Sequence, residues 1–258
     1  MEHVAVLISG AGDLGRGVAR KLCERLLKPQ NILCETRGPQ RHLSLREEDF
    51  RVRIATDPPP ICDSLLISFP PSEDYEKEVA RALACWNKSK PALLVSSIGV
   101  FTQDDGSLLD ETSAVDESSA LFRAETLARE AGAHVLRLAG LYDDTRGPQF
   151  YWQEKKKVTG WPGGLVNLIH REDAAEACVR LMRSELPADT WCLSDGNPVL
   201  RGDIVQVWSR FKNEEPAVFT ETNGVVGKKI SSSKLREALE WEPRHASFRD
   251  FVAKLSLR

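Results

Sequence analysis

The sequence predicts an α/β fold in which helices cover both faces of a parallel sheet. From residue 4 to about residue 140, short apolar runs alternate with amphipathic stretches. The runs are almost continuously apolar, as expected of strands that are buried on both faces. In the stretch VAVLISGAGDLGRGVARKL (4–22), three glycines spaced G-x-G-x-x-G lie between an apolar run and the start of a helical pattern. The 258 residues suffice for one large domain or for one domain with a modest appendage.

The first part of the chain contains six expected strands and three expected helices. The strands are the apolar runs 4–9, 31–36, 51–56, 64–69, 92–97 and 133–140. Apolar residues at helical spacing predict helices over 14–27, 73–87 and 117–131. The segment 37–50 is too polar to assign to a helix.

The regular alternation of apolar runs and amphipathic stretches ends after residue 140. Two turn-rich links, YDDTRGPQ and GWPGG, flank a short basic and aromatic segment. Strands are expected at 165–170 and 190–195, and helices at 171–184, 202–212, 232–240 and 247–255. We therefore expect residues 146–258 to form a cap interleaved with the sheet rather than an independent domain.

Composition narrows the class of ligand and the compartment. A net charge of −3, with acids and bases spread along the chain, argues against a nucleic-acid partner and favours a small molecule. There is no apolar run of about 18 residues and no signal-peptide pattern, so the expectation is a soluble, cytoplasmic protein that does not bind a membrane. The six cysteines are far apart, and we interpret them as reduced packing residues.

The glycine loop predicts a dinucleotide site. Gly10 permits the tight turn, Gly12 lets a pyrophosphate approach the backbone, and Gly15 lets helix and strand pack closely. The helix start, including Asp13 and Leu14, offers main-chain N–H groups and the positive end of the helix dipole. The alternative is a glycine-rich turn without a ligand.

The end of the second strand bears on which dinucleotide binds. An acid there accepts hydrogen bonds from the ribose hydroxyls of NAD, whereas an arginine pairs with the 2′-phosphate of NADP. The sequence CETRGP offers both, as Glu35 and Arg37, which point the same way by strand alternation. Because arginine can pair bidentately with phosphate, NADP(H) is favoured over NAD(H), which remains the alternative.

Four later segments carry a resemblance to a known family. They are SSIGVF (96–101), VLRLAGLY (135–142), VNLIHREDAAEA (166–177) and KKISSSKLREALEWEP (228–243). With the glycine loop, they resemble the atypical or extended short-chain dehydrogenase/reductases of the NAD-dependent epimerase/dehydratase superfamily, and most closely its YeeZ-like branch. The resemblance covers essentially the whole chain.

The resemblance implies a Rossmann doubly wound parallel sheet over residues 1–145 that binds a nicotinamide cofactor, followed by a small substrate-binding region over 146–258. It implies cofactor contacts for Phe69 and Pro70, in the loop after the fourth strand, and for Ser96 at the end of the fifth. Ser97 matches the serine that positions the substrate carbonyl or hydroxyl in active relatives. A hydroxyl that merely satisfies backbone groups at a strand end is the alternative for Ser97.

The catalytic tyrosine and lysine of the family are missing. The family's Tyr-x-x-x-Lys helix aligns so that Glu117 and Leu121 occupy the two positions. Glu117 is a conceivable acid or base, although an exposed helix glutamate is the commoner case. A literal Tyr-x-x-x-Lys occurs at Tyr151 to Lys155, but it follows the sixth strand, in the wrong element.

Candidate substrate residues lie in the C-terminal region. The resemblance places Asn167 at the cleft, and Arg146 and the lysines 155–157 in a segment that lines the substrate pocket of extended relatives; these cations suit an anionic substrate such as a nucleotide sugar. His170 and Asp173 are three residues apart, but no third ligand is obvious, so we expect no metal and a helix-start role for Asp173.

Two hypotheses for function follow. In the first, the chain is an NADP(H)-dependent oxidoreductase or epimerase-like enzyme acting on a small or sugar-like carbonyl or alcohol. In the second, it is a non-catalytic NADP(H)-binding regulatory or sensor protein, which the missing tyrosine and lysine favour. A monomer and a homodimer are both compatible with the sequence.

Overall fold

The computed structural model describes residues 2–25, 27–56 and 58–255. The chain divides into two compact units, each built from three segments. Unit 1 comprises Met1–Val100, Asp116–Arg137 and Ala175–Trp191, and unit 2 comprises Phe101–Val115, Leu138–Ala174 and Cys192–Arg258. The chain therefore passes between the units several times.

A parallel sheet forms the centre of unit 1. In the described part of the chain it has seven strands in the order β12-β7-β5-β4-β1-β2-β3. Their bounds are β1 (His3–Ser9), β2 (Ile32–Thr36), β3 (Arg51–Ile54), β4 (Ile61–Ile67), β5 (Ala92–Ser97), β7 (His134–Leu138) and β12 (Thr190–Leu193). The order reverses at β1, so β2 and β4 flank it and their carboxyl ends meet beside the glycine loop. The expected Rossmann doubly wound fold is confirmed.

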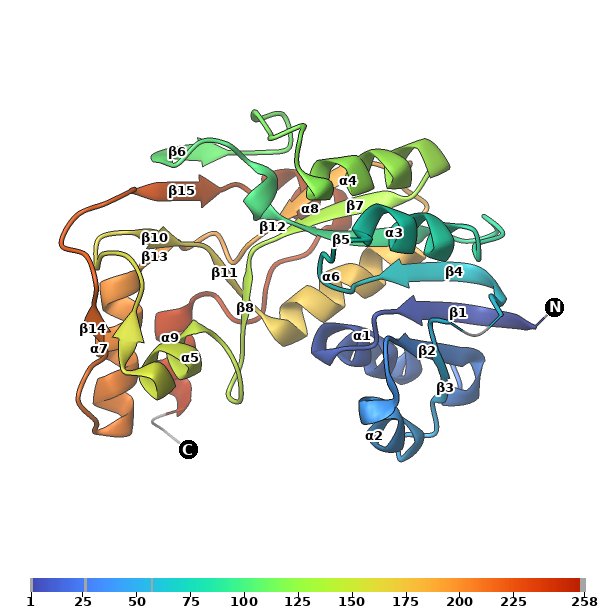
Figure 1. Ribbon diagram of the computed structural model, residues 1–258, viewed down its shortest axis with the longest axis horizontal. Helices are drawn as coiled ribbons and strands as arrows, with labels where there is room; N and C mark the ends of the chain where they lie inside the picture. The colour runs from blue at the N-terminus through green and yellow to red at the C-terminus, as the bar shows by residue number, and fades with distance from the viewer. Residues whose placement is uncertain (1, 26, 57, 256–258) are drawn as a thin grey trace. The chain divides into compact units, whose positions relative to one another are not determined.

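Helices cover both faces of the sheet in unit 1 (Figure 1). Helices α3 (Tyr75–Leu83) and α4 (Ala120–Ala131) pack side by side on one face. Helix α1 (Asp13–Glu24) lies on the other face with α6 (Arg171–Arg183), where Glu176 pairs with Arg25 and Lys21. A short helix α2 (His42–Arg46), preceded by the 3-10 turn Pro39–Arg41, lies in the segment that the sequence left unassigned.

Unit 2 consists of short strand pairs and helices. The pairs are β6 (Asp105–Leu109) with β15 (Gly227–Ile230), β8 (Gly140–Tyr142) with β11 (Leu168–His170), β10 (Leu165–Val166) with β13 (Val199–Leu200), and β9 (Lys157–Val158) with β14 (Val218–Phe219). The helices are α5 (Pro148–Lys155), α7 (Arg201–Lys212), α8 (Ser233–Leu239) and α9 (Phe248–Leu255). Aromatic side chains dominate its core, among them Tyr142, Trp208, Phe248 and Phe251.

Two expected elements differ from the structure, and one helix of unit 2 is additional. The strand expected over 165–170 is interrupted at Asn167, which separates β10 from β11. The helix expected from residue 117 begins at Ala120, because Ser119 caps it by accepting a hydrogen bond from the Phe122 N–H. Helix α5 was not expected.

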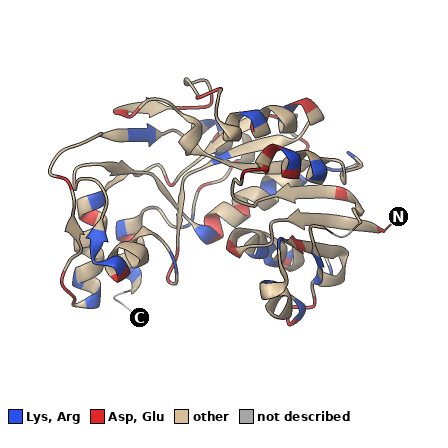
Figure 2. Ribbon diagram, in the orientation of Figure 1, with Lys and Arg blue, Asp and Glu red and all other residues tan. Residues whose placement is uncertain are grey.

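Acidic and basic residues are interspersed along the helices of both units (Figure 2). No helix in the described ranges is long and apolar enough to cross a membrane. The described cysteines are free thiols, and all but Cys23 are buried.

Candidate functional site

The glycine loop is anchored by the strands on either side of it. The main-chain N–H groups of Gly10 and Ala11 donate to the Glu35 carbonyl, at 3.0 and 2.9 Å. The Ser68 hydroxyl donates to the Gly10 carbonyl at 2.9 Å. The loop is therefore held between the ends of β2 and β4 before any ligand is present.

The three glycines serve different purposes. Gly10 has a positive φ of 97°, and a Cβ there would lie 2.5 Å from the Phe69 nitrogen. A Cβ on Gly15 would lie 2.6 Å from the Gly10 carbonyl oxygen. A Cβ on Gly12 would meet nothing nearer than the same oxygen at 4.0 Å. Gly10 and Gly15 are required by the packing of the loop, whereas Gly12 leaves open space.

That open space lies at the N-terminus of α1. Gly12 is the N-cap residue, and no side chain caps the first turn. The main-chain N–H groups of such a turn, together with the helix dipole, attract anions. Of the other two residues predicted here, Asp13 pairs with Arg41 and Leu14 is 8% exposed. These features fit the pyrophosphate of a dinucleotide.

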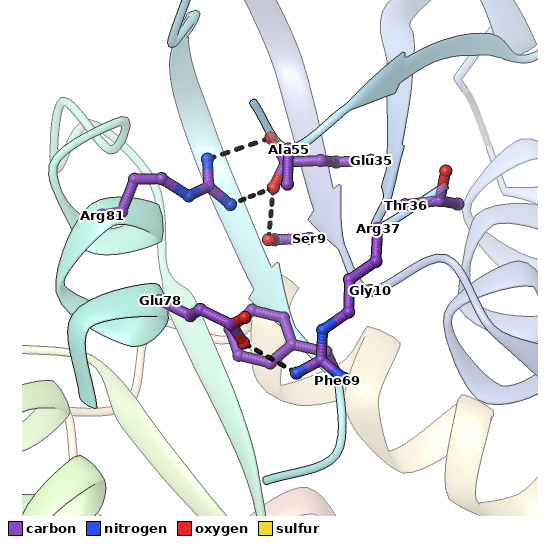
Figure 3. Close-up of a pocket in the computed structure, with 9 residues that line it drawn as sticks. All are labelled: Ser9, Gly10, Glu35, Thr36, Arg37, Ala55, Phe69, Glu78 and Arg81. Atoms are coloured by element: carbon purple, nitrogen blue, oxygen red, sulfur yellow. Dashed lines mark hydrogen bonds and ion pairs between the residues drawn. The ribbon is translucent and has the colours of Figure 1, made fainter. Parts of the chain in front are cut away.

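A small hollow lies beside the loop (Figure 3). It is formed where β1, β2 and β3 end and where the loop after β4 leads to α3. Its lining residues are Ser9, Gly10, Glu35, Thr36, Arg37, Ala55, Phe69, Glu78 and Arg81. Its place at the strand-order reversal is where open α/β sheets bind ligands.

Glu35 lines the hollow but is fully engaged with its neighbours. Its side chain is 1% exposed and accepts a hydrogen bond from the Ser9 hydroxyl at 2.6 Å. Arg81 from α3 donates to both carboxylate oxygens, and the Arg53 Nε lies 3.1 Å from one of them. Because a buried carboxylate is stable only when paired, these guanidinium groups account for its burial.

Arg37 is the more exposed charge at the hollow. Its side chain is 48% exposed, and its Nη2 pairs with Glu78 at 2.7 Å and donates to the Pro70 carbonyl at 3.0 Å. The guanidinium carbon lies 5.7 Å from the centre of the Phe69 ring. The structure thus brings together Arg37, Phe69 and Pro70, which the sequence predicted as cofactor contacts.

Ser96 and Ser97 at the end of β5 make internal hydrogen bonds. Ser96 is buried, and its hydroxyl donates to Glu125 at 2.6 Å. The hydroxyl of half-buried Ser97 accepts from the Gly99 N–H at 3.0 Å, as in the alternative that the sequence left open. A Cβ on Gly99 would lie 3.3 Å from the Ser97 oxygen and 3.9 Å from Leu121, so Ser97 and Leu121 lie near each other.

The predicted acid or base, Glu117, does not lie on a helix. It is exposed in the turn before α4. Leu121, at the position aligned with the family's lysine, packs against the unit 1 core. The tyrosine of unit 1, Tyr75, is 1% exposed and packs edge-on against Phe69. In unit 2, Tyr142 is buried, whereas Tyr151 lies on α5 and is 60% exposed.

The sequence analysis did not identify Glu125 as the centre of a buried network of ion pairs and hydrogen bonds. It is fully buried on α4 and pairs with Arg137 of β7 at 2.9 Å and with Arg129 at 3.3 Å, besides accepting from Ser96. An Ala-Glu pair after the aligned lysine position was the sequence signal. A glutamate within a helical pattern does not reveal its burial until its partners on β5 and β7 are known.

In unit 2, Asn167 is tied to β15. Its amide nitrogen donates to the Lys228 carbonyl at 2.8 Å, and its oxygen accepts from the Ile230 N–H at 3.0 Å. The side chain is 5% exposed. These two hydrogen bonds fix Asn167, which separates β10 from β11, to the neighbouring strand β15.

The other predicted substrate residues lie on the surface. Arg146 and lysines 155–157 are exposed, and Lys156 pairs with Glu214.

A third residue, His245, lies beside His170 and Asp173, although no third candidate was obvious in the sequence. His245 stacks on His170 with ring centres 3.6 Å apart, and its Nδ1 lies 2.9 Å from Asp173. The Asp173 oxygens also accept the N–H groups of Arg244 and His245, at 3.0 and 2.9 Å. Asp173 thus anchors the 244–245 segment from the first turn of α6. Burial, helped by His245, lowers the pKa of His170 to about 4.

The fold defines the chain as a Rossmann α/β protein with a glycine loop at the strand-order reversal. Neither the protein-family models nor the curated proteins give a match to its sequence. Similarity therefore rests on solved structures.

Several solved structures match over nearly the whole chain. A functionally unknown conserved protein from Silicibacter pomeroyi is 21% identical, with a TM-score of 0.78 over 100% of this chain and 99% of that one. MoeE5, solved with UDP-glucose and NAD, is 14% identical with a TM-score of 0.78, over 98% and 97%. A human epimerase family protein, solved with NADPH, is 12% identical with a TM-score of 0.74, over 99% and 100%. At these identities the likeness shows the fold alone.

Proposed function

We propose that this protein binds NADP(H) and is an atypical member of the extended short-chain dehydrogenase/reductases. Gly12 is the observation that carries the proposal, because its lack of a side chain meets no internal packing need and leaves the α1 N-terminus open to an anion. The fold shared with MoeE5 and the human epimerase family protein, whose structures contain NAD and NADPH, supports a nicotinamide dinucleotide.

The preference for NADP(H) over NAD(H) is supported by the charges in the hollow. The buried Glu35 carboxylate, which would otherwise accept the ribose hydroxyls, is occupied by Ser9, Arg53 and Arg81. Arg37 presents a half-exposed guanidinium at the same place. A cation here pairs favourably with a 2′-phosphate. The residues proposed to hold the cofactor are the 10–15 loop for the pyrophosphate, and Arg37, Phe69 and Pro70 for the adenosine end.

For activity, we propose an oxidoreductase or epimerase-like reaction on a small or sugar-like carbonyl or alcohol. The bound nicotinamide would supply or accept the hydride. Ser97 is the proposed positioning hydroxyl, and Glu117 the candidate acid or base. Exposed Arg146 and lysines 155–157 suit an anionic substrate, and the UDP-glucose in the MoeE5 structure makes nucleotide sugars the first compounds to test.

A non-catalytic NADP(H) sensor is the second candidate, and Leu121 favours it. This apolar side chain packs against the core at the position of the family's lysine, so it cannot lower the pKa of a proton donor there. A sensor requires tight cofactor binding without turnover. The two candidates therefore differ in chemistry and agree on the cofactor.

The first experiment is a titration of the purified protein with NADPH and NADH, followed by tryptophan fluorescence or isothermal calorimetry. We expect NADPH to bind more tightly. Arg37→Ala should weaken NADPH by about 10-fold or more, because a charged hydrogen-bonded pair contributes about 1.5–3 kcal/mol, and should leave NADH nearly unchanged. Arg46→Ala, which removes an exposed arginine from α2, is the matched control.

Equal weakening of NADPH and NADH by Arg37→Ala would contradict the assigned 2′-phosphate contact. Binding of neither cofactor would mean that the glycine loop is only a turn. Once binding is measured, NADPH absorbance with a panel of carbonyl compounds and nucleotide sugars separates the enzyme from the sensor. Turnover that falls in Ser97→Ala supports the enzyme.

A further inference from the structure

The Arg37–Glu78 pair faces the hollow at the place proposed for the 2′-phosphate. The Glu78 Oε2 lies 2.7 Å from the Arg37 Nη2 (Figure 3). Glu78 is on α3 and is one third exposed, so it shares solvent access with the guanidinium. A carboxylate thus already pairs with the cation that a phosphate would need.

Other contacts keep both groups at the hollow. The Ser72 hydroxyl donates to the same Glu78 oxygen at 3.2 Å, so this carboxylate has a second partner besides Arg37. Arg37 for its part also donates to the Pro70 carbonyl and lies over the Phe69 ring. Removal of the Glu78 charge therefore leaves Arg37 two contacts that hold it at the hollow.

We infer that Glu78 is an internal competitor for the 2′-phosphate and limits the affinity of the protein for NADP(H), an inference that rests on the proposed function. In the free protein the Glu78 carboxylate forms an ion pair with the Arg37 guanidinium. When a 2′-phosphate binds, two anions share one guanidinium, and like charges at this distance repel. NADH lacks the 2′-phosphate, so its binding does not require this exchange.

The inference predicts a gain of affinity, which a folding defect cannot imitate. Glu78→Gln keeps an acceptor for Ser72 and removes the charge. Because a half-exposed ion pair contributes up to about 1 kcal/mol, we expect NADPH to bind about two- to fivefold more tightly, with NADH unchanged. The fragments 2′,5′-ADP and 5′-AMP should reproduce the same difference. Glu76→Gln, which removes an exposed charge from the same helix, is the matched control and should leave both affinities unchanged.

A double variant tests the mechanism. In Arg37→Ala/Glu78→Gln the gain should disappear, because there is no guanidinium to release. Unchanged or weaker NADPH binding by Glu78→Gln overturns the inference, and so does an equal gain for NADH. If wild-type NADPH preference and its loss in Arg37→Ala are both observed, such a result leaves the proposed cofactor intact. Absence of NADPH preference in the wild type overturns both.

Discussion

At the residue scale, the glycine motif divides into two structural positions and one open position. The three glycines are indistinguishable in the motif, but in the structure each is surrounded by different atoms. Gly10 and Gly15 are crowded by main-chain atoms, whereas Gly12 faces space at the helix N-terminus. Substitutions at these positions should therefore separate folding from binding.

We expect Gly12→Ala to lower NADPH affinity by about 10-fold or more, because a methyl group would stand where the pyrophosphate approaches. Its φ of −75° suits alanine, so the free energy of unfolding should change by less than about 1 kcal/mol. Gly15→Ala should instead destabilise the protein by about 1–3 kcal/mol, since its Cβ meets a carbonyl oxygen. Calorimetric titration and urea unfolding measure the two effects. Full NADPH affinity in Gly12→Ala would refute the assignment of the anion site.

At the element scale, buried ion pairs join neighbouring elements in unit 1. Glu125 links α4 to β7 through Arg137 and to β5 through Ser96. Glu35 links β2 to α3 through Arg81 and to β3 through Arg53. Such pairs contribute little over an apolar replacement, but removing one partner leaves an uncompensated buried charge.

Glu125→Gln should consequently destabilise the protein by about 3 kcal/mol or more, because Arg137 is only 4% exposed and would lose its carboxylate. Glu130→Gln, an exposed position on the same helix, should change stability by no more than about 0.5 kcal/mol. Chemical unfolding of the two variants checks this. Equal stability of the two variants would show that the network is dispensable.

The elements that differ from expectation depend on tertiary contacts. Helix α5 has no clean apolar periodicity, and it is stabilised where Phe150 packs against Trp208 of α7, with ring centres 4.8 Å apart. The strand expected over 165–170 breaks at Asn167, whose side chain makes hydrogen bonds to the backbone of β15. Neither partner is a neighbour in sequence.

At the scale of the whole molecule, stability should reflect two buried groups of unit 2 with opposite shifts. Burial raises the pKa of Asp195 to about 7, and it lowers the pKa of His170 to about 4. Between pH 4 and 7 folded Asp195 holds a proton that the unfolded chain releases, so its contribution to stability falls as pH rises. Between pH 4 and 6.5 unfolded His170 binds a proton that the folded form excludes, so its contribution rises.

The two slopes oppose each other in the wild type, so single variants should expose them. In Asp195→Asn, stability should rise between pH 4 and 6.5, by about 3 kcal/mol for a shift of this size. In His170→Gln, stability should fall between pH 4 and 7. Urea unfolding across this range measures both. Parallel pH profiles in the two variants would contradict the assigned shifts.

The sequence by itself determined the fold class, the glycine loop and the position of Arg37, because apolar periodicity and glycine spacing are local signals that survive without knowledge of distant partners. The tertiary structure decided which charged side chains pair with one another. It paired Glu35 with Arg81, set Glu78 against Arg37, and brought His245 to Asp173 from 72 residues away. These outcomes depend on burial and on contacts between residues remote in the chain, which only the folded arrangement specifies.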